Sequence, residues 1–169
     1  MIDEPAYVQN SVVAAKKYDH TFCRHDAEAV CCAHGVTVES PEAATMILGT
    51  GGTTGVHKNS ITHVDNICFI AAGDSVFALE VPSLKMVWCM QVDIATCFGV
   101  FWVEKHQCLI TWGEIFVSCY TKDGKKIWKT SGADIFTQGF KLTTDTIEVV
   151  DCNNTTYRVT IPSGHIEKI

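Results

Sequence analysis

The sequence predicts a mainly β fold: three to four blade-like antiparallel β-meanders with a short N-terminal helix. One observation behind this is an offset of 40 residues that aligns Gly73 with Gly113 and Trp88 with Trp128. Another is that short, alternating apolar runs separated by turn residues fill the chain after residue 55, where nothing has helical periodicity. A period of this length built from short strands is typical of propeller blades or stacked β-meanders, so a partial or small β-propeller-like fold is expected.

Composition favours one folded domain over residues 1–169. Of the 169 residues, 47% are hydrophobic and 19% are charged, which is enough apolar material for a core and argues against disorder. We expect residues 1–55 to hold the helix and an irregular or degenerate blade. Residues 56–169 then form three repeats of about 40 residues each.

The N-terminal elements are predicted from local patterns. Pro5 suits the first turn of a helix over residues 5–18, in which apolar residues from Tyr7 to Tyr18 fall roughly on one face. Residues 28–34 and 36–39 are expected to be strands separated by Gly35, and 45–48 another strand. The glycine- and threonine-rich segment 49–55 is expected to be a loop.

The repeat units cover residues 56–92, 93–132 and 133–169. In the second unit the pattern predicts strands at 97–103, 107–111, 115–120 and 126–129, and Asp123-Gly124 is a strong hairpin signal between the last two. The third unit follows the same plan, with strands at 136–142, 147–151, 155–161 and 165–168.

The first unit carries a family resemblance. Residues 73–80 (GDSVFALE) and 85–88 (KMVW) resemble the repeat of the PQQ-like (quinoprotein-type) β-propellers, and the second unit is similar through Gly113, residues 123–125 and Trp128. The resemblance implies that Trp88 and Trp128 each stack against the neighbouring blade. The third unit has Lys168 where the tryptophan belongs, as a terminal capping unit would.

The number of blades leaves two arrangements open. A closed propeller needs at least four blades, and the repeat shows three. Residues 20–55 supply a degenerate fourth blade in one arrangement. In the other, the blades form an open, curved array whose exposed edge is covered by the N-terminal helix or by a partner, and a homodimer is one way to pair such edges.

A cluster of cysteines and histidines lies between residues 20 and 34. Alternation along a strand places Cys23 with His25 and Cys32 with His34 on common faces, so these four are the candidate metal ligands. No Cys-x-x-Cys knuckle is present, and core thiols with surface histidines are the favoured interpretation. No metal and no other cofactor is therefore expected.

Several classes of function are disfavoured by composition. A net charge of −6 argues against binding nucleic acid, and no apolar run is long enough to span a membrane. The acidic start does not resemble a secretory signal, which predicts a cytoplasmic protein whose nine cysteines are reduced. No catalytic constellation is apparent, so the protein is expected not to be an enzyme.

The partner-binding residues predicted from the sequence are Trp112, Glu114 and Glu104, which fall at expected turns. A small acidic domain without a catalytic set suggests a protein-binding module, most concretely a bacterial immunity protein that neutralises a cognate toxin. The partner expected from the charge is a basic toxin domain. The alternative is a Cys/His metal-binding or small-ligand-binding β-propeller-like protein.

Overall fold

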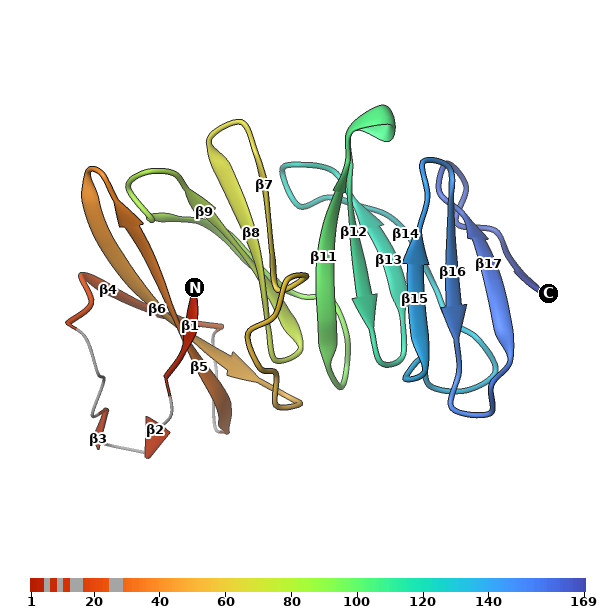
Figure 1. The fold of residues 1–169 in the computed structure, drawn as a ribbon, viewed down its shortest axis with the longest axis horizontal. Helices are drawn as coiled ribbons and strands as arrows, with labels where there is room; N and C mark the ends of the chain where they lie inside the picture. Colours follow the sequence, from red (N-terminus) through yellow and green to blue (C-terminus); the bar gives the residue numbers. More distant parts are fainter. Residues whose placement is uncertain (5–6, 9–10, 13–16, 25–28) are drawn as a thin grey trace.

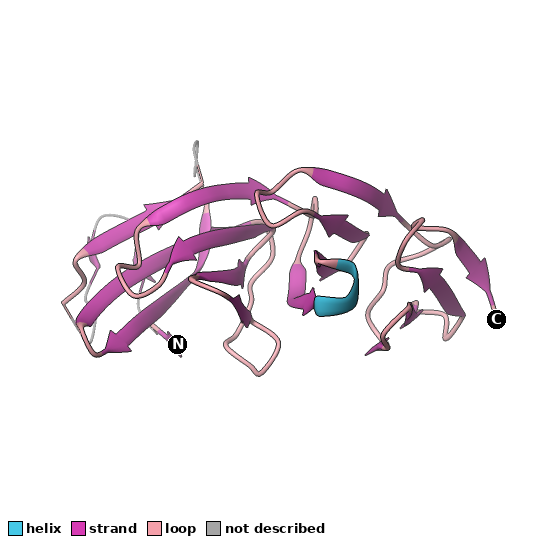
Figure 2. Cartoon of the chain, turned by 90° about the horizontal axis from the view of Figure 1, so that it is seen from above, coloured by secondary structure: helices cyan, strands magenta, loops and turns pink. Residues whose placement is uncertain are grey.

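Four four-stranded sheets stand side by side along the long axis of the molecule. The computed structural model describes residues 1–4, 7–8, 11–12, 17–24 and 29–169. Figure 1 shows the first sheet at one end and the fourth, which holds the C-terminus, at the other. Seen from above, the row is bent into an arc that does not close into a ring (Figure 2). The chain therefore combines both arrangements expected from the sequence: the N-terminal residues supply a fourth sheet, and the array is open.

The first sheet has the strand order β1-β5-β6-β4. Its strands are β1 (Ile2–Asp3), β4 (His20–Cys23), β5 (Val30–Glu39) and β6 (Glu42–Thr50). Strands β5 and β6 form a long antiparallel pair, whereas β4 runs parallel to β6. A separate pair of two-residue strands is formed by β2 (Tyr7–Val8) and β3 (Ser11–Val12).

The predicted N-terminal helix at 5–18 is wrong. Tyr7 pairs with Val12 and Val8 with Ser11 in an antiparallel hairpin, while residues 5–6, 9–10 and 13–16 lie outside the described part of the chain. Valine is stiff at χ1 and favours extended backbone, which outweighs a short amphipathic match. In the described residues the helical structure consists of one 3-10 turn, η1 (Glu104–His106).

The predicted break at Gly35 is also wrong, because β5 runs through it without interruption. The glycine is needed for a close approach from outside the strand. A Cβ atom at this position would overlap the hydroxyl oxygen of Tyr18, whose ring packs on this face of the sheet. Gly35 therefore makes room for a tertiary contact and does not mark a turn.

The other three sheets are simple meanders. The second contains β7 (Ile61–Val64), β8 (Ile67–Ala72), β9 (Ser75–Glu80) and β10 (Met86–Gln91). The third contains β11 (Cys97–Val103), β12 (Cys108–Gly113), β13 (Val117–Tyr120) and β14 (Lys126–Thr130). The fourth contains β15 (Gly139–Leu142), β16 (Thr146–Val150), β17 (Thr156–Thr160) and β18 (Ile166–Lys168). The four strands predicted in each of the last two repeat units are present, with ends that shift by a few residues.

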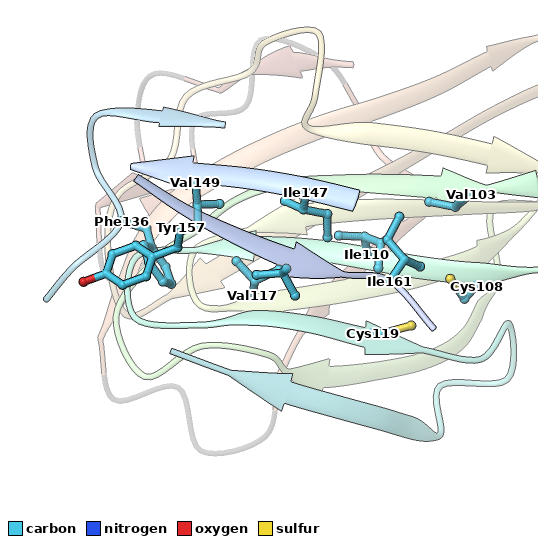
Figure 3. Close-up of a cluster of buried hydrophobic side chains, with 11 residues drawn as sticks. Val103, Cys108, Ile110, Val117, Cys119, Phe136, Ile147, Val149, Tyr157 and Ile161 are labelled. Atoms are coloured by element: carbon cyan, nitrogen blue, oxygen red, sulfur yellow. The ribbon is translucent and has the colours of Figure 1, made fainter. Parts of the chain in front are cut away.

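Each sheet buries an apolar layer against the next. Ile47 and Val36 of the first sheet pack with Ile70 and Phe77 of the second. Between the second and third sheets lie Phe69, Leu109 and their neighbours, and between the third and fourth lies a cluster around Ile110, Ile147 and Val159 (Figure 3). This layer-by-layer burial holds together a row of repeats that share no single central core.

A turn of left-handed backbone recurs every 40 residues, at Leu84, Gly124 and Gly164, with φ of 53°, 82° and 69°. Glycines occupy the second and third of these positions, where the tryptophan of the preceding sheet lies against the turn. The first sheet has no tryptophan in its sequence to offer to the second. Leu84 instead fills that space with its own side chain and is only 1% exposed.

The outer face of the fourth sheet is charged. Arg158 of β17 lies between Glu148 of β16 and Glu167 of β18, at 3.5 and 3.6 Å, and Lys141 of β15 also faces Glu148. These ion pairs leave the outer face of the fourth sheet polar, in contrast to the apolar layer that this sheet shares with the third.

All nine cysteines are free thiols in the structure. In the residues that the structure describes, no helix is long and apolar enough to cross a bilayer.

Candidate protein interface

A groove opens between the second and third sheets. Its volume is about 600 Å³. The groove is lined by Asn66, Ile67, Val87, Trp88, Lys122 and Asp123. Strands β8 and β10 contribute the apolar side chains, and the turn before β14 contributes the charged ones. An apolar floor with a polar rim is the usual anatomy of a protein interface.

Trp88 is fixed at the floor of the groove. Its indole nitrogen donates a hydrogen bond to the carbonyl oxygen of Lys122 at 3.2 Å, and its ring packs against Phe69 with 5.6 Å between centroids. The turn of the next sheet lies on the ring at Gly124, where a Cβ would come within 3.2 Å of two indole atoms. Three contacts leave the side chain little rotamer freedom to lose on binding, which suits an anchoring residue.

The same contact recurs one repeat later. The indole nitrogen of Trp128 donates to the carbonyl oxygen of Ile161 at 2.6 Å, and Gly164 lies on the indole ring. Trp88 and Trp128 therefore both pack against the following sheet, as the family resemblance implies. Figure 1 shows β14, which carries Trp128, beside the fourth sheet.

Charged residues surround the mouth of the groove. Lys122 pairs with Asp65 at 2.6 Å, and Lys125 pairs with Asp123 at 3.0 Å. The hydrogen bond from Lys122 holds the pKa of Asp65 below its usual value. These solvent-exposed pairs add little to stability, but they define a polar border around the apolar floor.

Strand β10 forms the open edge of the second sheet beside this groove. Its six residues (MVWCMQ) carry no charge, and Val87 and Met86 are 55% and 40% exposed. The equivalent edge strand β14 (KIWKT) instead carries Lys126 and Lys129 at the positions of Met86 and Cys89. Both strands have a β-bulge, at Val87 and at Ile127, so they differ in their lysines. Lysines on an edge strand discourage pairing with another chain, and β10 is therefore the less protected edge of the two.

The sequence-predicted partner residues do not form one surface. Glu104 begins η1 at one end of β11 and β12, where it accepts a hydrogen bond from the Trp102 indole nitrogen at 2.8 Å. Glu114 follows β12 at the opposite end. The expectation that Trp112 lies in a turn is wrong, because it belongs to β12 and stacks on Phe140 of the fourth sheet, with 5.0 Å between centroids.

The candidate metal ligands are also separated. Cys23 packs with Ala33, Met46 and Leu48 on one face of the first sheet. His34 lies opposite Ile47 on the other face, together with Cys32, and His25 lies outside the described residues. Among the residues that the structure describes, no three His, Cys, Asp or Glu side chains gather as a metal site would require.

Sequence reasoning misses the groove because the groove is built from ordinary residues. The resemblance to the PQQ-like repeat implies that Trp88 packs against the next blade, and the structure shows this contact. The resemblance says nothing about the exposed face of the same strand. The signal that could locate the edge is the absence of lysine from residues 86–91, in contrast to residues 126–130 one repeat later.

No protein-family model matches the chain, and no curated protein matches it. Among solved structures it is similar to U3-55K, with a TM-score of 0.54 and 14% identity over 68% of this chain and 40% of that one. It is similar to the Pan2 WD40 domain of Neurospora crassa, with a TM-score of 0.55 and 14% identity over 66% of this chain and 37% of that one. It is also similar to the computationally designed Ika8 protein, with a TM-score of 0.58 and 8% identity over 75% of this chain and 40% of that one. The chain thus spans less than half the length of these structures, and its sheets have a β-propeller-like fold.

Proposed function

We propose that this chain is a cytoplasmic, non-enzymatic protein-binding module, and most concretely a bacterial immunity protein that neutralises a cognate toxin by binding it. The observation that carries the proposal is the uncharged, exposed edge of β10 beside the apolar groove at Trp88. An extended segment of the partner would add a strand to this edge through main-chain hydrogen bonds. An apolar side chain of that segment would enter the groove and supply specificity.

The net charge indicates which partners are favoured. At −6, the protein attracts a basic domain over a longer range than the contact itself and raises the rate of association. Toxins that act on nucleic acids are commonly basic. In the complex, the active surface of such a toxin would be covered by the arc of sheets, or the segment of the toxin that docks along β10 would itself be part of that surface.

The experiment uses a toxin candidate encoded next to this gene, produced alone and together with this chain. Co-expression is expected to restore growth, and isothermal titration calorimetry on the purified pair is expected to give a one-to-one complex. A neighbouring product that is not toxic, or one whose toxicity this chain does not relieve, would contradict the immunity proposal.

The repeat supplies a matched pair of variants that locates the interface. Val87→Lys places a charge on the exposed β10 edge, whereas Ile127→Lys makes the same change at the equivalent, 50% exposed position of β14. We expect Val87→Lys to weaken binding at least about tenfold and Ile127→Lys by less than about threefold. Equal effects of the two variants on the dissociation constant would show that the partner does not use β10.

A Glu114→Gln variant in the same titration tests the partner residues predicted from the sequence.

A further inference from the structure

A second, smaller pocket lies on the first sheet, away from the groove. Its volume is about 290 Å³. It is lined by Asp3, Glu4, Cys31, Cys32, Ala33, Thr53, Thr54 and Gly55. Strands β1 and β5 form one side of this pocket, and the loop after β6 forms the other. Nothing in the proposed binding function uses it.

The hydroxyl of Thr54 links the sulfur of Cys32 to the ring of His34 in this pocket. The Oγ1 atom of Thr54 lies 3.2 Å from Cys32 Sγ and 3.1 Å from Nε2 of His34, so the hydroxyl bridges the two side chains. The amide of Gly73 donates to the same oxygen at 3.0 Å, which leaves the hydroxyl proton free to be donated to the sulfur or to the ring.

His34 is buried and faces a carboxylate. It is 1% exposed, and its Nδ1 lies 2.9 Å from Oδ1 of Asp3, off the direction of a regular hydrogen bond. The amide of Val56 donates to both carboxylate oxygens of Asp3 at 3.0 Å and holds that group in place. A fixed negative charge beside a buried imidazole favours the protonated ring.

The two side chains reinforce each other's charged forms. Burial alone would raise the pKa of Cys32, but the hydrogen bonds from His34 and Thr54 outweigh it and lower the pKa. Burial alone would lower the pKa of His34, but Cys32 and Asp3 outweigh it and raise the pKa. A thiolate beside an imidazolium is the arrangement that makes a cysteine nucleophilic.

We propose that Cys32, held against His34 and Thr54 in this pocket, is a nucleophilic thiol that small hydroperoxides oxidise to a sulfenic acid. The thiolate attacks the terminal oxygen of the hydroperoxide, an S–O bond forms, and the O–O bond breaks. The departing alkoxide or hydroxide takes a proton from His34. The sulfur loses two electrons, the peroxide gains them, and the products are Cys32 sulfenic acid and an alcohol or water.

The other cysteines of the chain provide internal comparisons. Burial raises the pKa of Cys68 to about 11 and that of Cys89 and Cys97 to about 12, so these thiols are held in the unreactive form. Cys31 lines the same pocket and is exposed, whereas Cys32 is 9% exposed. Reactivity that followed exposure would favour Cys31, and reactivity that followed activation by His34 would favour Cys32.

The test exposes the full chain to hydrogen peroxide in the presence of dimedone, which traps sulfenic acids, and locates the adduct by tandem mass spectrometry. We expect the adduct at Cys32 in the wild type and in Cys31→Ser, and its loss in Cys32→Ser. A dimedone adduct that is most abundant at Cys31, or adducts distributed over the nine cysteines according to their exposure, would overturn the proposal.

Two further variants separate activation from folding. His34→Gln removes the proton donor, and we expect it to slow the trapping rate at Cys32 at least about fivefold. Because His34 is buried and its replacement can perturb the fold, Asp3→Asn removes only the facing charge and keeps an acceptor for Val56. Asp145→Asn changes an exposed carboxylate in the turn before β16 as the control. A folded Asp3→Asn variant that reacts as fast as Asp145→Asn refutes the role given to the carboxylate and the imidazole.

Discussion

Replacing Gly164 by alanine tests whether the contact between a tryptophan and the following turn holds neighbouring sheets together. Gly164 has a φ of 69°, and a Cβ there would lie 2.6 Å from two ring atoms of Trp128. An L-residue in left-handed backbone costs about 1–2 kcal/mol. Forcing a methyl group into a packed contact costs about 1–3 kcal/mol more. We therefore expect Gly164→Ala to lower the free energy of unfolding by about 2–5 kcal/mol, a large share of the total for a domain of this size.

The matched control is Gly139→Ala in the same sheet. Gly139 lies in extended strand β15, and a Cβ there would meet only Val150 at 3.5 Å, an ordinary contact. Its replacement is expected to leave stability unchanged or to raise it by up to about 1 kcal/mol, because alanine restricts the unfolded chain. The measurement is urea unfolding followed by far-ultraviolet circular dichroism, since fluorescence would report on Trp128 itself. A Gly164→Ala protein within about 0.5 kcal/mol of the wild type would refute the reasoning.

Three other outcomes follow from the same structure. Leu84→Ala leaves a cavity at a position that is 1% exposed, and urea unfolding should show that the free energy of unfolding falls by about 2–4 kcal/mol. Asp93 accepts hydrogen bonds from the backbone amides of Ala95, Ile115 and Phe116. Asp93→Ala should therefore lower the free energy of unfolding by about 3 kcal/mol or more. Asp93→Asn keeps a hydrogen-bond acceptor and should lower it by less in the same assay. The pKa of Cys32 is lowered and that of Cys152 is raised, so the alkylation rate of Cys32 relative to that of Cys152 should rise as the pH falls from about 9 to about 7. The other titratable groups around the Cys32 pocket are Asp3, Glu4, Cys31 and His34, and a constant ratio in a mass-spectrometric time course would contradict the pKa directions.

The repeat units can be predicted well because their signals are local. Strand β11 is expected at residues 97–103 and is found there. The alternation of apolar and polar residues and the turns at its ends can be recognised from neighbouring residues alone. The hairpin at Asp123-Gly124 is expected for the same reason. The register between strands then follows, because a shift by one residue would turn the apolar face outward.

The first sheet is harder to predict because distant residues decide it. Gly35 suggests a turn when only its neighbours are considered, and its reason for being glycine is Tyr18, 17 positions earlier. The helix predicted at 5–18 rests on a pattern of about four turns, too short to outweigh strand-forming valines and tertiary pairing.

The candidate sites show the same division. Alternation along a strand is enough to predict that Cys32 and His34 share one face of β5. The groups that complete their surroundings, Asp3 and Thr54, come from the first strand and from a loop 20 residues further along. Trp112 resembles a turn residue because Gly113 follows it, but β12 extends through both residues and carries the tryptophan into the contact with Phe140.

The charged outer face of the fourth sheet has a consequence for how copies of this protein meet one another. A row of repeats with apolar ends would stack end to end, and because such a contact is head-to-tail it would grow into a filament. At this end a second copy would have to strip water from Arg158, Glu148 and Glu167, which already satisfy one another. The ion pairs that add little to folding therefore make an end-to-end contact between copies at this face unfavourable.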